Sequence, residues 1–392
     1  MIPRNLSSAL RKMPDYFPVV FLNGPRQSGK TTLIRDTFPG MPYYSLENPD
    51  LRLLAEDDPR GFLANLPEGG ILDEVQRVPH LFNYLQEVVD THPGRRFILS
   101  GSQNFLLHEK ISQSLSGRAG LLTLLPMCTP ELVAGLPGFE AGNWERLIFE
   151  GFYPALHARA IPAGLYYSSY LATYLERDVR LIRNIGDMSD FLRFVKLCAG
   201  RAGQILNLSS LAADTGISPN TAKSWLSALE ASYVVFTLNP YHKNFNKRLV
   251  KMPRLYFYDT GLLCHLLDLK EAGQVGSHYA VGALFENLVI AELIKHYYNR
   301  AQRPPLFFWR DNKGSEVDLV VELGAGELSM EIKAGKTRQS DFFKGLAYWQ
   351  KISGNPPERS FVVYGGKDNR FSTTRGTYIP WNRVPDWIAE VF

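Results

Sequence analysis

Residues 24–31 read Gly-Pro-Arg-Gln-Ser-Gly-Lys-Thr, and this octet restricts the possible folds of the chain more than any other feature. An almost wholly apolar run, residues 17–22, precedes it as a buried parallel strand would, and residues 32–38 can continue as a helix. Gly24 and Gly29 permit backbone conformations in which successive N–H groups face an anion, and the positive end of the next helix favours negative charge. The spacing therefore predicts a phosphate-binding loop between a strand and a helix, with a chance glycine turn as the alternative.

The octet and the residue after it form the predicted nucleotide-binding loop: Gly24, Pro25, Arg26, Gln27, Ser28, Gly29, Lys30, Thr31 and Thr32. We expect Lys30 to reach the β- and γ-phosphates of ATP, because its position in the octet is that of the lysine in a phosphate loop. We expect the hydroxyl group of Thr31 to bind Mg²⁺.

An acidic pair follows a second apolar segment. Residues 71–72 lead into Asp73 and Glu74, which a parallel strand would deliver to the carboxyl edge of the same sheet. Asp73 suits the outer shell of a bound Mg²⁺, and Glu74 is placed to orient or deprotonate the water that attacks the γ-phosphate. The alternative is a solvated acidic pair at the end of an ordinary strand.

Further polar groups are expected near the nucleotide. A third predicted strand, residues 96–100, runs into residues 102–104, whose polar side chains, Gln103 among them, are candidates for sensing the γ-phosphate. Arg118 lies in a predicted turn before a strand-like segment at 121–126. We expect it to meet a phosphate in its own chain or, as an arginine finger does, in a neighbouring copy within a homo-oligomer. A solvated turn arginine is the alternative.

The composition describes a compact folded protein. A length of 392 residues suffices for two to four domains, and 45% hydrophobic with 21% charged residues argues against general disorder. The net charge of +4 permits nucleic-acid binding but is too small for this length to require it. The three cysteines are far apart, the eight histidines show no metal-ligand spacing, and no long apolar segment occurs. We therefore expect a cytoplasmic protein without structural zinc or a membrane segment.

The middle of the chain is predicted to hold a helical lid and then a winged helix. Residues 129–190 turn helical and rich in tyrosine, which suits a lid or linker beside the nucleotide. Residues 208–216 and 218–229 form a predicted helix-turn-helix, because a glycine ends the first helix and a serine followed by proline begins the second. Strand-like segments at 233–238 and 254–258 follow, as in a wing.

Basic residues gather between the two strands of the predicted wing: Lys243, Lys247, Arg248 and Lys251. No acidic residue occurs from 239 to 254. Together with the polar face of the second helix, residues 220–224, this wing fits contact with DNA phosphates. A protein-docking module or a spacer is the alternative.

The last third of the chain carries a dispersed set of acids and one lysine. Two alternating strand-like segments, which pair as a hairpin, follow an amphipathic helix that carries Glu286. The period of two puts Glu331 and Lys333 on the same face of one strand, and the hairpin brings Asp318 beside them. This is the arrangement of a PD-(D/E)XK nuclease core.

Such a set is suited to phosphodiester chemistry. Asp318, Glu331 and Glu286 can bind one or two Mg²⁺ ions that activate water, and Lys333 can offset the developing charge. The alternative is a degraded or purely DNA-binding domain, in which Asp318 and Glu331 make structural ion pairs.

The segments GPRQSGKT, YSLENP, ILDEVQRVP, LSGSQNFLL and SLSGRAG together resemble the AAA-type ATPase domain of a large prokaryotic family whose members carry a C-terminal domain of unknown function. The similarity continues through YLERDV, KRLVKMPRLYFYDTGLL, EVDLVV and EIKAGK, so it covers most of the chain. The resemblance implies ATP binding, a helical and winged-helix middle, and a nuclease-like end.

We therefore expect a multidomain α/β protein with four parts: a P-loop AAA-type ATPase core at 1–128, a helical lid or linker at 129–190, a winged-helix domain at 191–269, and a C-terminal α/β restriction-endonuclease-like domain of the PD-(D/E)XK type at 270–392. The expected function is Mg²⁺-dependent ATP hydrolysis coupled to DNA binding, with Mg²⁺-dependent DNA cleavage left open. The alternative is a nucleotide-switched signalling or scaffold ATPase whose C-terminal domains bind protein and are catalytically inactive.

Overall fold

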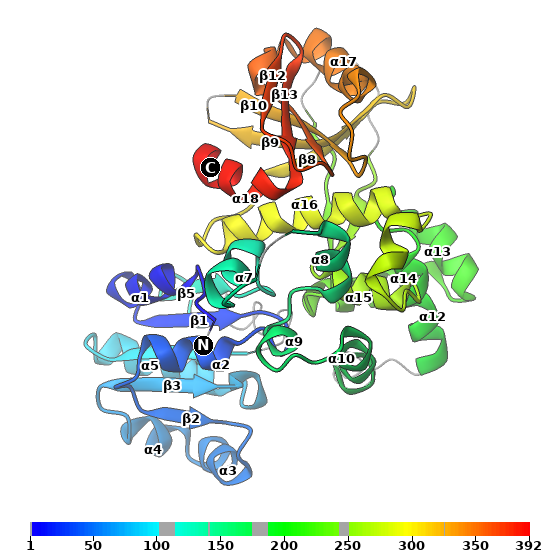
Figure 1. Cartoon of the computed structure of the whole chain (residues 1–392). Coiled ribbons are helices and arrows are strands. Elements are labelled where there is room, and N and C mark those ends of the chain that lie inside the picture. Colours follow the sequence, from blue (N-terminus) through cyan, green and yellow to red (C-terminus); the bar gives the residue numbers. More distant parts are fainter. Residues whose placement is uncertain (1, 102–113, 140–141, 175–186, 243–250, 325) are drawn as a thin grey trace. The chain divides into compact units, whose positions relative to one another are not determined.

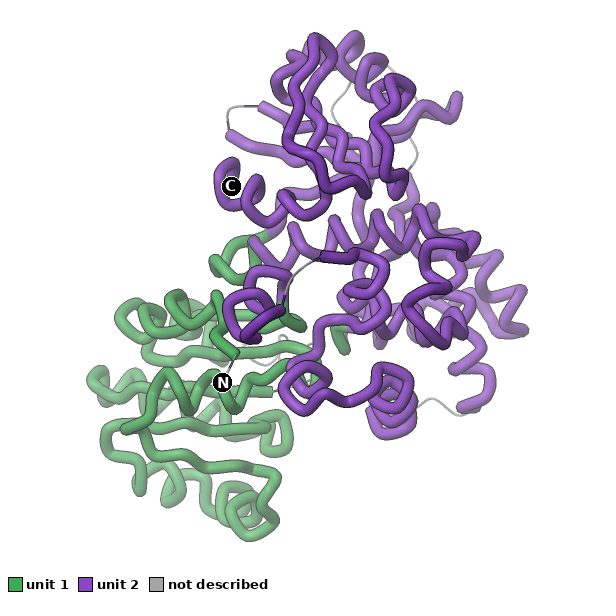
Figure 2. The backbone as a smooth tube through the Cα atoms, in the orientation of Figure 1, with its two compact units in different colours: residues 1–127, 231–233, 297–303 green, residues 128–230, 234–296, 304–392 purple. Residues whose placement is uncertain are grey.

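The computed structural model describes residues 2–101, 114–139, 142–174, 187–242, 251–324 and 326–392 (Figure 1). The chain divides into two compact units (Figure 2). Unit 1 holds residues 1–127, 231–233 and 297–303, and unit 2 holds residues 128–230, 234–296 and 304–392.

Unit 1 is built on a five-stranded parallel sheet in the order β2-β3-β4-β1-β5. The strands are β1 (Val19–Asn23), β2 (Tyr43–Ser45), β3 (Gly69–Asp73), β4 (Arg96–Ser100) and β5 (Ala119–Thr123). The strands expected at 17–22, before Asp73 and at 96–100 are thus confirmed. The strand expected at 121–126 was placed two residues too late, because residues 119–123 are the ones in register with β1.

Helices cover both faces of this sheet (Figure 1). Because side chains alternate along a strand, Val19 and Phe21 join one hydrophobic core while Val20 and Leu22 join the other. The first core includes residues of α3 (Pro49–Asp57), α4 (Pro59–Ala64) and α5 (Leu81–Thr91). The second includes residues of α1 (Ser7–Tyr16) and α2 (Lys30–Thr37). A three-layer α/β arrangement results.

The described middle of the chain is mainly helical. Its helices are α7 (Thr129–Gly135), α8 (Trp144–Glu150), α9 (Pro154–Ala158), α10 (Ala163–Tyr170), α12 (Met188–Ala199), α13 (Leu208–Thr215), α14 (Pro219–Ala231) and α15 (Thr260–Leu266). Between α14 and α15, β6 (Val235–Leu238) pairs in antiparallel fashion with β7 (Arg254–Phe257). The helices and strands expected between residues 208 and 258 are present, and the assignment of a winged helix to them stays a prediction.

The tyrosines of the expected lid pack against one another. Tyr166, Tyr167 and Tyr170 of α10 are buried, and each has a ring centroid within 6.4 Å of the ring of Tyr153. The hydroxyl groups of Tyr153 and Tyr170 share a hydrogen bond of 2.7 Å. These rings therefore form an internal core of unit 2, and the lid function stays a prediction.

The last third of the chain forms a six-stranded mixed sheet in the order β12-β13-β11-β10-β9-β8. Its strands are β8 (Leu306–Arg310), β9 (Glu316–Leu323), β10 (Gly326–Lys333), β11 (Ser360–Tyr364), β12 (Phe371–Thr373) and β13 (Gly376–Pro380). The helices of this part are α16 (Val281–Tyr298), α17 (Lys344–Ser353) and α18 (Val384–Val391). The expected hairpin is confirmed, because β9 and β10 pair in antiparallel fashion.

The three cysteines, Cys128, Cys198 and Cys264, are buried and not joined by disulfides. No helix in the described ranges combines the length and the apolar character needed to cross a membrane.

Candidate functional site

The candidate nucleotide site begins at the carboxyl end of β1 in unit 1. β1 ends at Asn23 and α2 begins at Lys30, so residues 24–29 form the loop between them. Gly24 and Gly29 have φ angles of 143° and 94°, where other residues are strained. A Cβ atom at Gly24 would also stand 2.1 Å from the carbonyl oxygen of Leu124. The expected order of strand, glycine loop and helix is confirmed.

Lys30 is buried in the first turn of α2. Its ammonium group donates hydrogen bonds to the carbonyl oxygens of Gly24 (2.9 Å) and Pro25 (2.8 Å). Burial lowers the pKa of Lys30 to about 8, although the nearby carboxylates of Glu74 and Asp73 act in the opposite direction. The loop thus encloses a positive charge that neutral carbonyl groups satisfy only in part, and a phosphate would be a stronger partner.

Asp73, at the end of β3, accepts hydrogen bonds from three hydroxyl groups. Its Oδ2 accepts from Thr31 Oγ1 (2.8 Å) and from the Tyr43 hydroxyl (2.7 Å), and its Oδ1 accepts from Ser100. The strand order explains this meeting, because β4, which ends at Ser100, lies between β1 and β3. The hydroxyl of Thr31 and the carboxylate of Asp73 are oxygen donors of the kind that Mg²⁺ prefers, so this pair fits the ion.

Glu74 follows Asp73 in a left-handed backbone conformation, with φ 57° and ψ 41°. Such a conformation is uncommon for a residue with a side chain, and it often occurs at functional sites. Burial raises the pKa of Glu74, Lys30 opposes this shift, and Asp73 adds to it. The side-chain amide of Gln76 donates to Glu74 Oε2. A raised pKa makes the carboxylate a better proton acceptor, as a general base requires.

The other residues of the predicted loop differ in exposure: Pro25 and Ser28 are buried, Arg26 is partly buried, and Gln27 and Thr32 are exposed. Gln27 has a positive φ of 61°, so it forms the turn of the loop. The predicted γ-phosphate sensors at 102–104, Gln103 included, lie outside the described residues.

Arg118 lies at the amino ends of the parallel strands, whereas the loop lies at their carboxyl ends. Its carbonyl oxygen accepts from the backbone N–H of Val19 (3.2 Å), and β5 then runs parallel to β1 until Thr123 lies beside Asn23. The length of β1 therefore separates Arg118 from the loop by roughly 16 Å. Its guanidinium group binds the carboxylate of Asp90 at 2.6 and 2.8 Å. This position favours contact with a neighbouring copy over contact with the nucleotide of its own chain, and both stay predictions.

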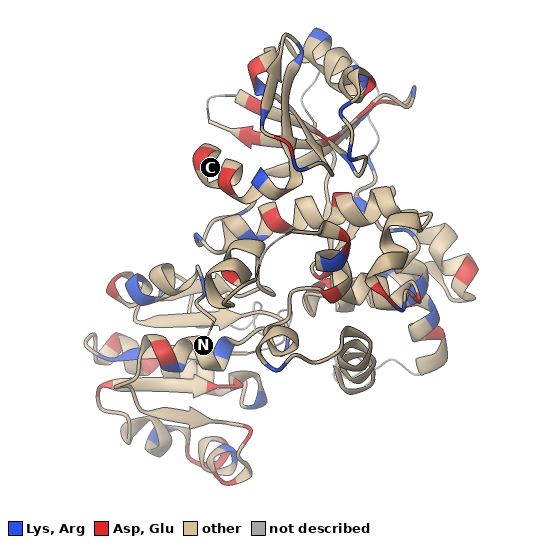
Figure 3. Ribbon diagram, in the orientation of Figure 1, with Lys and Arg blue, Asp and Glu red and all other residues tan. Residues whose placement is uncertain are grey.

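Part of the expected DNA-contacting surface lies in the described residues of unit 2. Ser218 caps α14, because its Oγ accepts from the backbone N–H of Thr221 (3.0 Å), and Asn220 and Lys223 are exposed in the next turns. Lys251 is exposed before β7, whereas Lys243, Lys247 and Arg248 lie outside the described residues. Figure 3 shows acidic and basic residues mixed along the elements, so net charge alone does not mark an interface.

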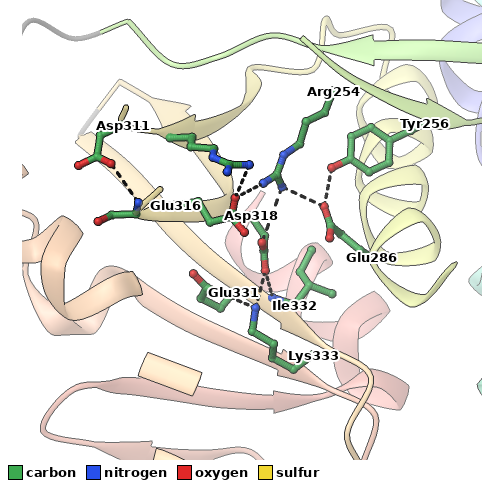
Figure 4. Close-up of polar contacts among 11 residues, drawn as sticks. Arg254, Tyr256, Glu286, Asp311, Glu316, Asp318, Glu331, Ile332 and Lys333 are labelled. Carbon is green, nitrogen blue, oxygen red and sulfur yellow. Dashed lines mark hydrogen bonds and ion pairs between the residues drawn. The ribbon is translucent and has the colours of Figure 1, made fainter. Parts of the chain in front are cut away.

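A second candidate site lies on the β9–β10 hairpin (Figure 4). Lys333 Nζ is 3.0 Å from Asp318 Oδ2 and 2.5 Å from Glu331 Oε2, so the lysine bridges the two acids. The backbone N–H of Ile332 donates to the same Asp318 oxygen at 2.9 Å. A cavity of about 590 Å³ opens here, and its lining includes Glu286, Asp318 and Lys333.

The charged groups of this second site shift one another's pKa values. Burial raises the pKa of Glu331 well above its usual range, and Asp318 adds to the shift. Burial and then Asp318 raise the pKa of Glu286 to about 8. For Asp318 the effect of burial is outweighed by Lys333 and Arg254, and its pKa is lowered. Asp318 is thus the acid that the surrounding cations hold in its charged form.

Arg254, at the start of β7, completes this cluster, and sequence reasoning missed it. Its side chain is 5% exposed, and its guanidinium group lies 3.2 Å from Glu286, 2.7 Å from Glu316 and 3.7 Å from Asp318. Tyr256, two residues along the same strand, donates a hydrogen bond of 2.5 Å to Glu286. Glu316 was missed as well, although its position two residues before Asp318 puts it on the same face of β9.

A metal site is not assembled from the predicted ligands Glu286, Asp318 and Glu331. Within the described ranges, no group of three or more His, Cys, Asp or Glu side chains is arranged to hold a metal ion. Arg254 and Lys333 neutralise these carboxylates instead. The two strand acids are thus ion-paired with Lys333, and their catalytic role stays a prediction.

Three family descriptions match successive parts of the chain. Residues 16–133 match an AAA domain, residues 141–273 match a domain of unknown function (DUF8612), and residues 281–384 match another domain of unknown function (DUF4143). With the parallel sheet and the phosphate loop, the first match makes this part of the chain a P-loop AAA-type ATPase domain.

Two known proteins are similar over most of the chain: the uncharacterized proteins Mb2031c of Mycobacterium bovis and Rv2008c of Mycobacterium tuberculosis. Each is 32% identical over 342 residues, which are 85% of this chain and 74% of the relative. Among solved structures, the Walker-type ATPase paby2304 of Pyrococcus abyssi has a TM-score of 0.46 at 15% identity and covers 69% of this chain and 96% of its own. AMPPCP-bound DnaA from Aquifex aeolicus has a TM-score of 0.27 at 15% identity, over 57% of this chain and 85% of its own.

Proposed function

Because this chain belongs to the same family as the two mycobacterial proteins and contains an AAA domain, we propose that it binds and hydrolyses ATP with Mg²⁺. One observation carries the proposal: the hydroxyl of Thr31 lies 2.8 Å from the carboxylate of Asp73. These residues are 42 positions apart in the sequence, and their contact joins the phosphate loop to the acidic end of β3. This contact supports a single ligand site formed by the loop and the acid.

Each residue of this site has a separate role in the proposed reaction. The N–H groups of the loop and the positive end of α2 attract the phosphates. Lys30 exchanges its two carbonyl partners for phosphate oxygens. Thr31 and Asp73 would hold Mg²⁺, which would supply positive charge against the phosphates. Glu74 orients the attacking water and accepts its proton.

Two variants separate binding from turnover. Lys30→Ala removes the charge that faces the phosphates, so ATP affinity should fall at least tenfold in a binding titration. Glu74→Gln should keep wild-type ATP affinity but lose about a hundredfold in phosphate release, because a general base contributes that much or more. Glu68→Gln, an exposed acid at the other end of β3, is the matched control. Normal hydrolysis by Glu74→Gln would show that another group activates the water.

We further propose that the middle of the chain binds DNA. The exposed first turns of α14 and the basic stretch between β6 and β7 support this proposal. Neutralising the four basic residues of the predicted wing (Lys243, Lys247, Arg248, Lys251) should weaken DNA binding and flatten its salt dependence, by roughly 0.9 in log–log slope for each DNA phosphate that the protein no longer neutralises. Neutralising four exposed cations elsewhere (Arg60, Arg146, Lys344, Arg383) is the control. An unchanged slope in the wing variant removes this surface from the DNA interface.

Two functions are proposed for the C-terminal module. The contacts of Lys333 with Asp318 and Glu331 support Mg²⁺-dependent DNA cleavage. The ion pairs that Arg254 makes favour the second candidate, a nucleotide-switched scaffold whose C-terminal part is catalytically inactive. Incubation of the protein with several DNA forms, Mg²⁺ or Mn²⁺, and with or without ATP decides between them. Cleavage that Asp318→Ala abolishes, at unchanged ATP affinity, supports the nuclease; equally intact DNA with both proteins supports the scaffold.

A further inference from the structure

We propose that Arg254 is the resident cation of the C-terminal site, so that a divalent metal ion reaches Asp318 and Glu286 only after the guanidinium group has left them. The inference deepens the proposed nuclease function and rests on it, because it states the condition under which the predicted ligands become available.

The guanidinium group of Arg254 lies among the predicted metal ligands (Figure 4). Arg254 Nη1 is 3.2 Å from Glu286 Oε1 and 3.7 Å from Asp318 Oδ1, so it stands between two of the three predicted metal ligands. A cation that bridged these two carboxylates would occupy the same space. The other terminal nitrogen, Nη2, is 2.7 Å from Glu316 Oε2. The guanidinium group therefore fills the place of the ion and also holds a third acid.

The net charge of the cluster also argues against a metal ion and Arg254 binding these acids at the same time. Four carboxylates, those of Glu286, Glu316, Asp318 and Glu331, face the cations Arg254, Lys333 and Arg310, the last of which is 3.4 Å from Glu316. Even in the limit where all four acids are ionised, the three cations leave the cluster only one excess negative charge. A divalent ion added to this set would make it positive and would lie against a buried like charge, which is costly at low dielectric. Metal binding and the Arg254 contacts therefore exclude each other.

Arg254 is held in place by its strand as well as by the acids. Asn287 of α16 accepts from the backbone N–H of Phe257 (2.8 Å) and donates to its carbonyl oxygen (2.7 Å), so β7 is fixed to the helix that carries Glu286. The guanidinium carbon lies 4.9 Å from the ring centroid of Phe308. Arg254 belongs to the segment that matches DUF8612, whereas the acids belong to the segment that matches DUF4143. The segment that matches DUF8612 thus supplies the cation that neutralises the acids of the segment that matches DUF4143.

The test is Mn²⁺ affinity of the full chain without nucleotide, measured by calorimetry. Arg254→Met removes the charge and keeps much of the side-chain volume, and it should bind Mn²⁺ at least tenfold more tightly than the wild type. Arg310→Met is the matched control, because Arg310 pairs with Glu316 but with neither Glu286 nor Asp318 among the ion pairs of the described residues. It should behave as the wild type. Adding Asp318→Asn to Arg254→Met should abolish the gain and so assign it to this site.

The proposal is overturned if Arg254→Met binds Mn²⁺ no more tightly than the wild type, or if its gain survives Asp318→Asn. Since loss of a buried cation leaves acids unpaired, the unfolding temperature is measured with and without Mn²⁺ as a second readout. Mn²⁺ should raise it more for Arg254→Met than for the wild type, and Asp318→Asn should remove that difference. If Arg254→Met does not fold, Arg254→Met with Glu316→Gln removes one cation and one acid together and permits the same comparison.

Metal binding and DNA cleavage are scored separately, so the two proposals fail in different ways. A gain in Mn²⁺ affinity without cleavage supports the role of Arg254 and argues against the nuclease. Cleavage by the wild type without any gain in Arg254→Met supports the nuclease and overturns the role of Arg254.

Discussion

At the scale of single residues, Lys30 links nucleotide binding to pH. Its pKa of about 8 in the nucleotide-free protein means that the side chain is charged below pH 8 and neutral above it. A bound phosphate stabilises the charged form, so ATP must bring in a proton above pH 8. We therefore predict that ATP affinity falls only about twofold from pH 7 to 8 and by nearly tenfold per pH unit well above pH 8, measured by titration at each pH.

Lys30→Arg is the control for this pH dependence, because arginine stays charged throughout the range. Its affinity can be weaker, but its profile should be flat between pH 7 and 10. A flat profile for the wild type would mean that Lys30 is charged in the free protein at every pH tested.

At the scale of elements, the docking of β7 on α16 depends on one side chain. Asn287 satisfies both backbone groups of Phe257, and both residues are fully buried. Asn287→Ala leaves a buried N–H and a buried carbonyl without these partners, and each such loss costs about 1–3 kcal/mol. We predict a decrease of about 2–6 kcal/mol in the free energy of unfolding, measured with urea. Asn369→Ala, at an exposed position, should change it by less than about 0.5 kcal/mol.

An unchanged free energy of unfolding in Asn287→Ala would show that β7 does not depend on this amide. The same variant should also loosen the hold on Arg254, so its Mn²⁺ affinity should shift in the direction of Arg254→Met.

At the scale of the whole molecule, Arg118 predicts an assembly. Arg118 lies at the amino ends of the parallel strands, opposite the phosphate loop of its own chain. We therefore expect a catalytic Arg118 to serve a neighbouring copy. Arg118→Ala and Glu74→Gln should each be inactive in ATP hydrolysis. An equimolar mixture should regain activity, because interfaces form in which one copy supplies Glu74 and the other supplies Arg118. The phosphate release of the mixture is compared with that of each variant alone.

A mixture of Glu74→Gln with Lys30→Ala is the control and should stay inactive, since both residues belong to the site of the same chain. If Arg118→Ala alone hydrolyses ATP normally, Arg118 serves only its ion pair with Asp90, and the assembly loses its support.

Local sequence determined the parts of the candidate nucleotide site whose strand, loop and helix the structure confirms. The loop from Gly24 to Thr31 has its conformation encoded within eight residues, and Asp73 follows directly on the strand that positions it. Tyr43 and Ser100 were not found, because their contact with Asp73 depends on the order of strands across the sheet. Ser100 ends a predicted strand and so gave a signal, whereas Tyr43 gave none.

What local sequence left open has the same physical origin. Arg118 was expected near a phosphate because it stands in a turn, but the register of β5 against β1 decides at which edge that turn lies. Period-two alternation correctly grouped Glu331 with Lys333 and, through the hairpin, with Asp318. It gave no information on Arg254, which enters from a strand 64 residues before Asp318.

The guanidinium group shared between two modules also limits how such proteins can diverge. Arg254 lies in one matched segment, and the acids that it neutralises lie in the next. A chimera that exchanged only residues 281–384 for those of a distant relative would place Arg254 against foreign side chains, or leave native acids facing a foreign strand. Exchange of one segment alone therefore separates the arginine from its acids, and we expect a chimera to keep this cluster only where both segments are exchanged together.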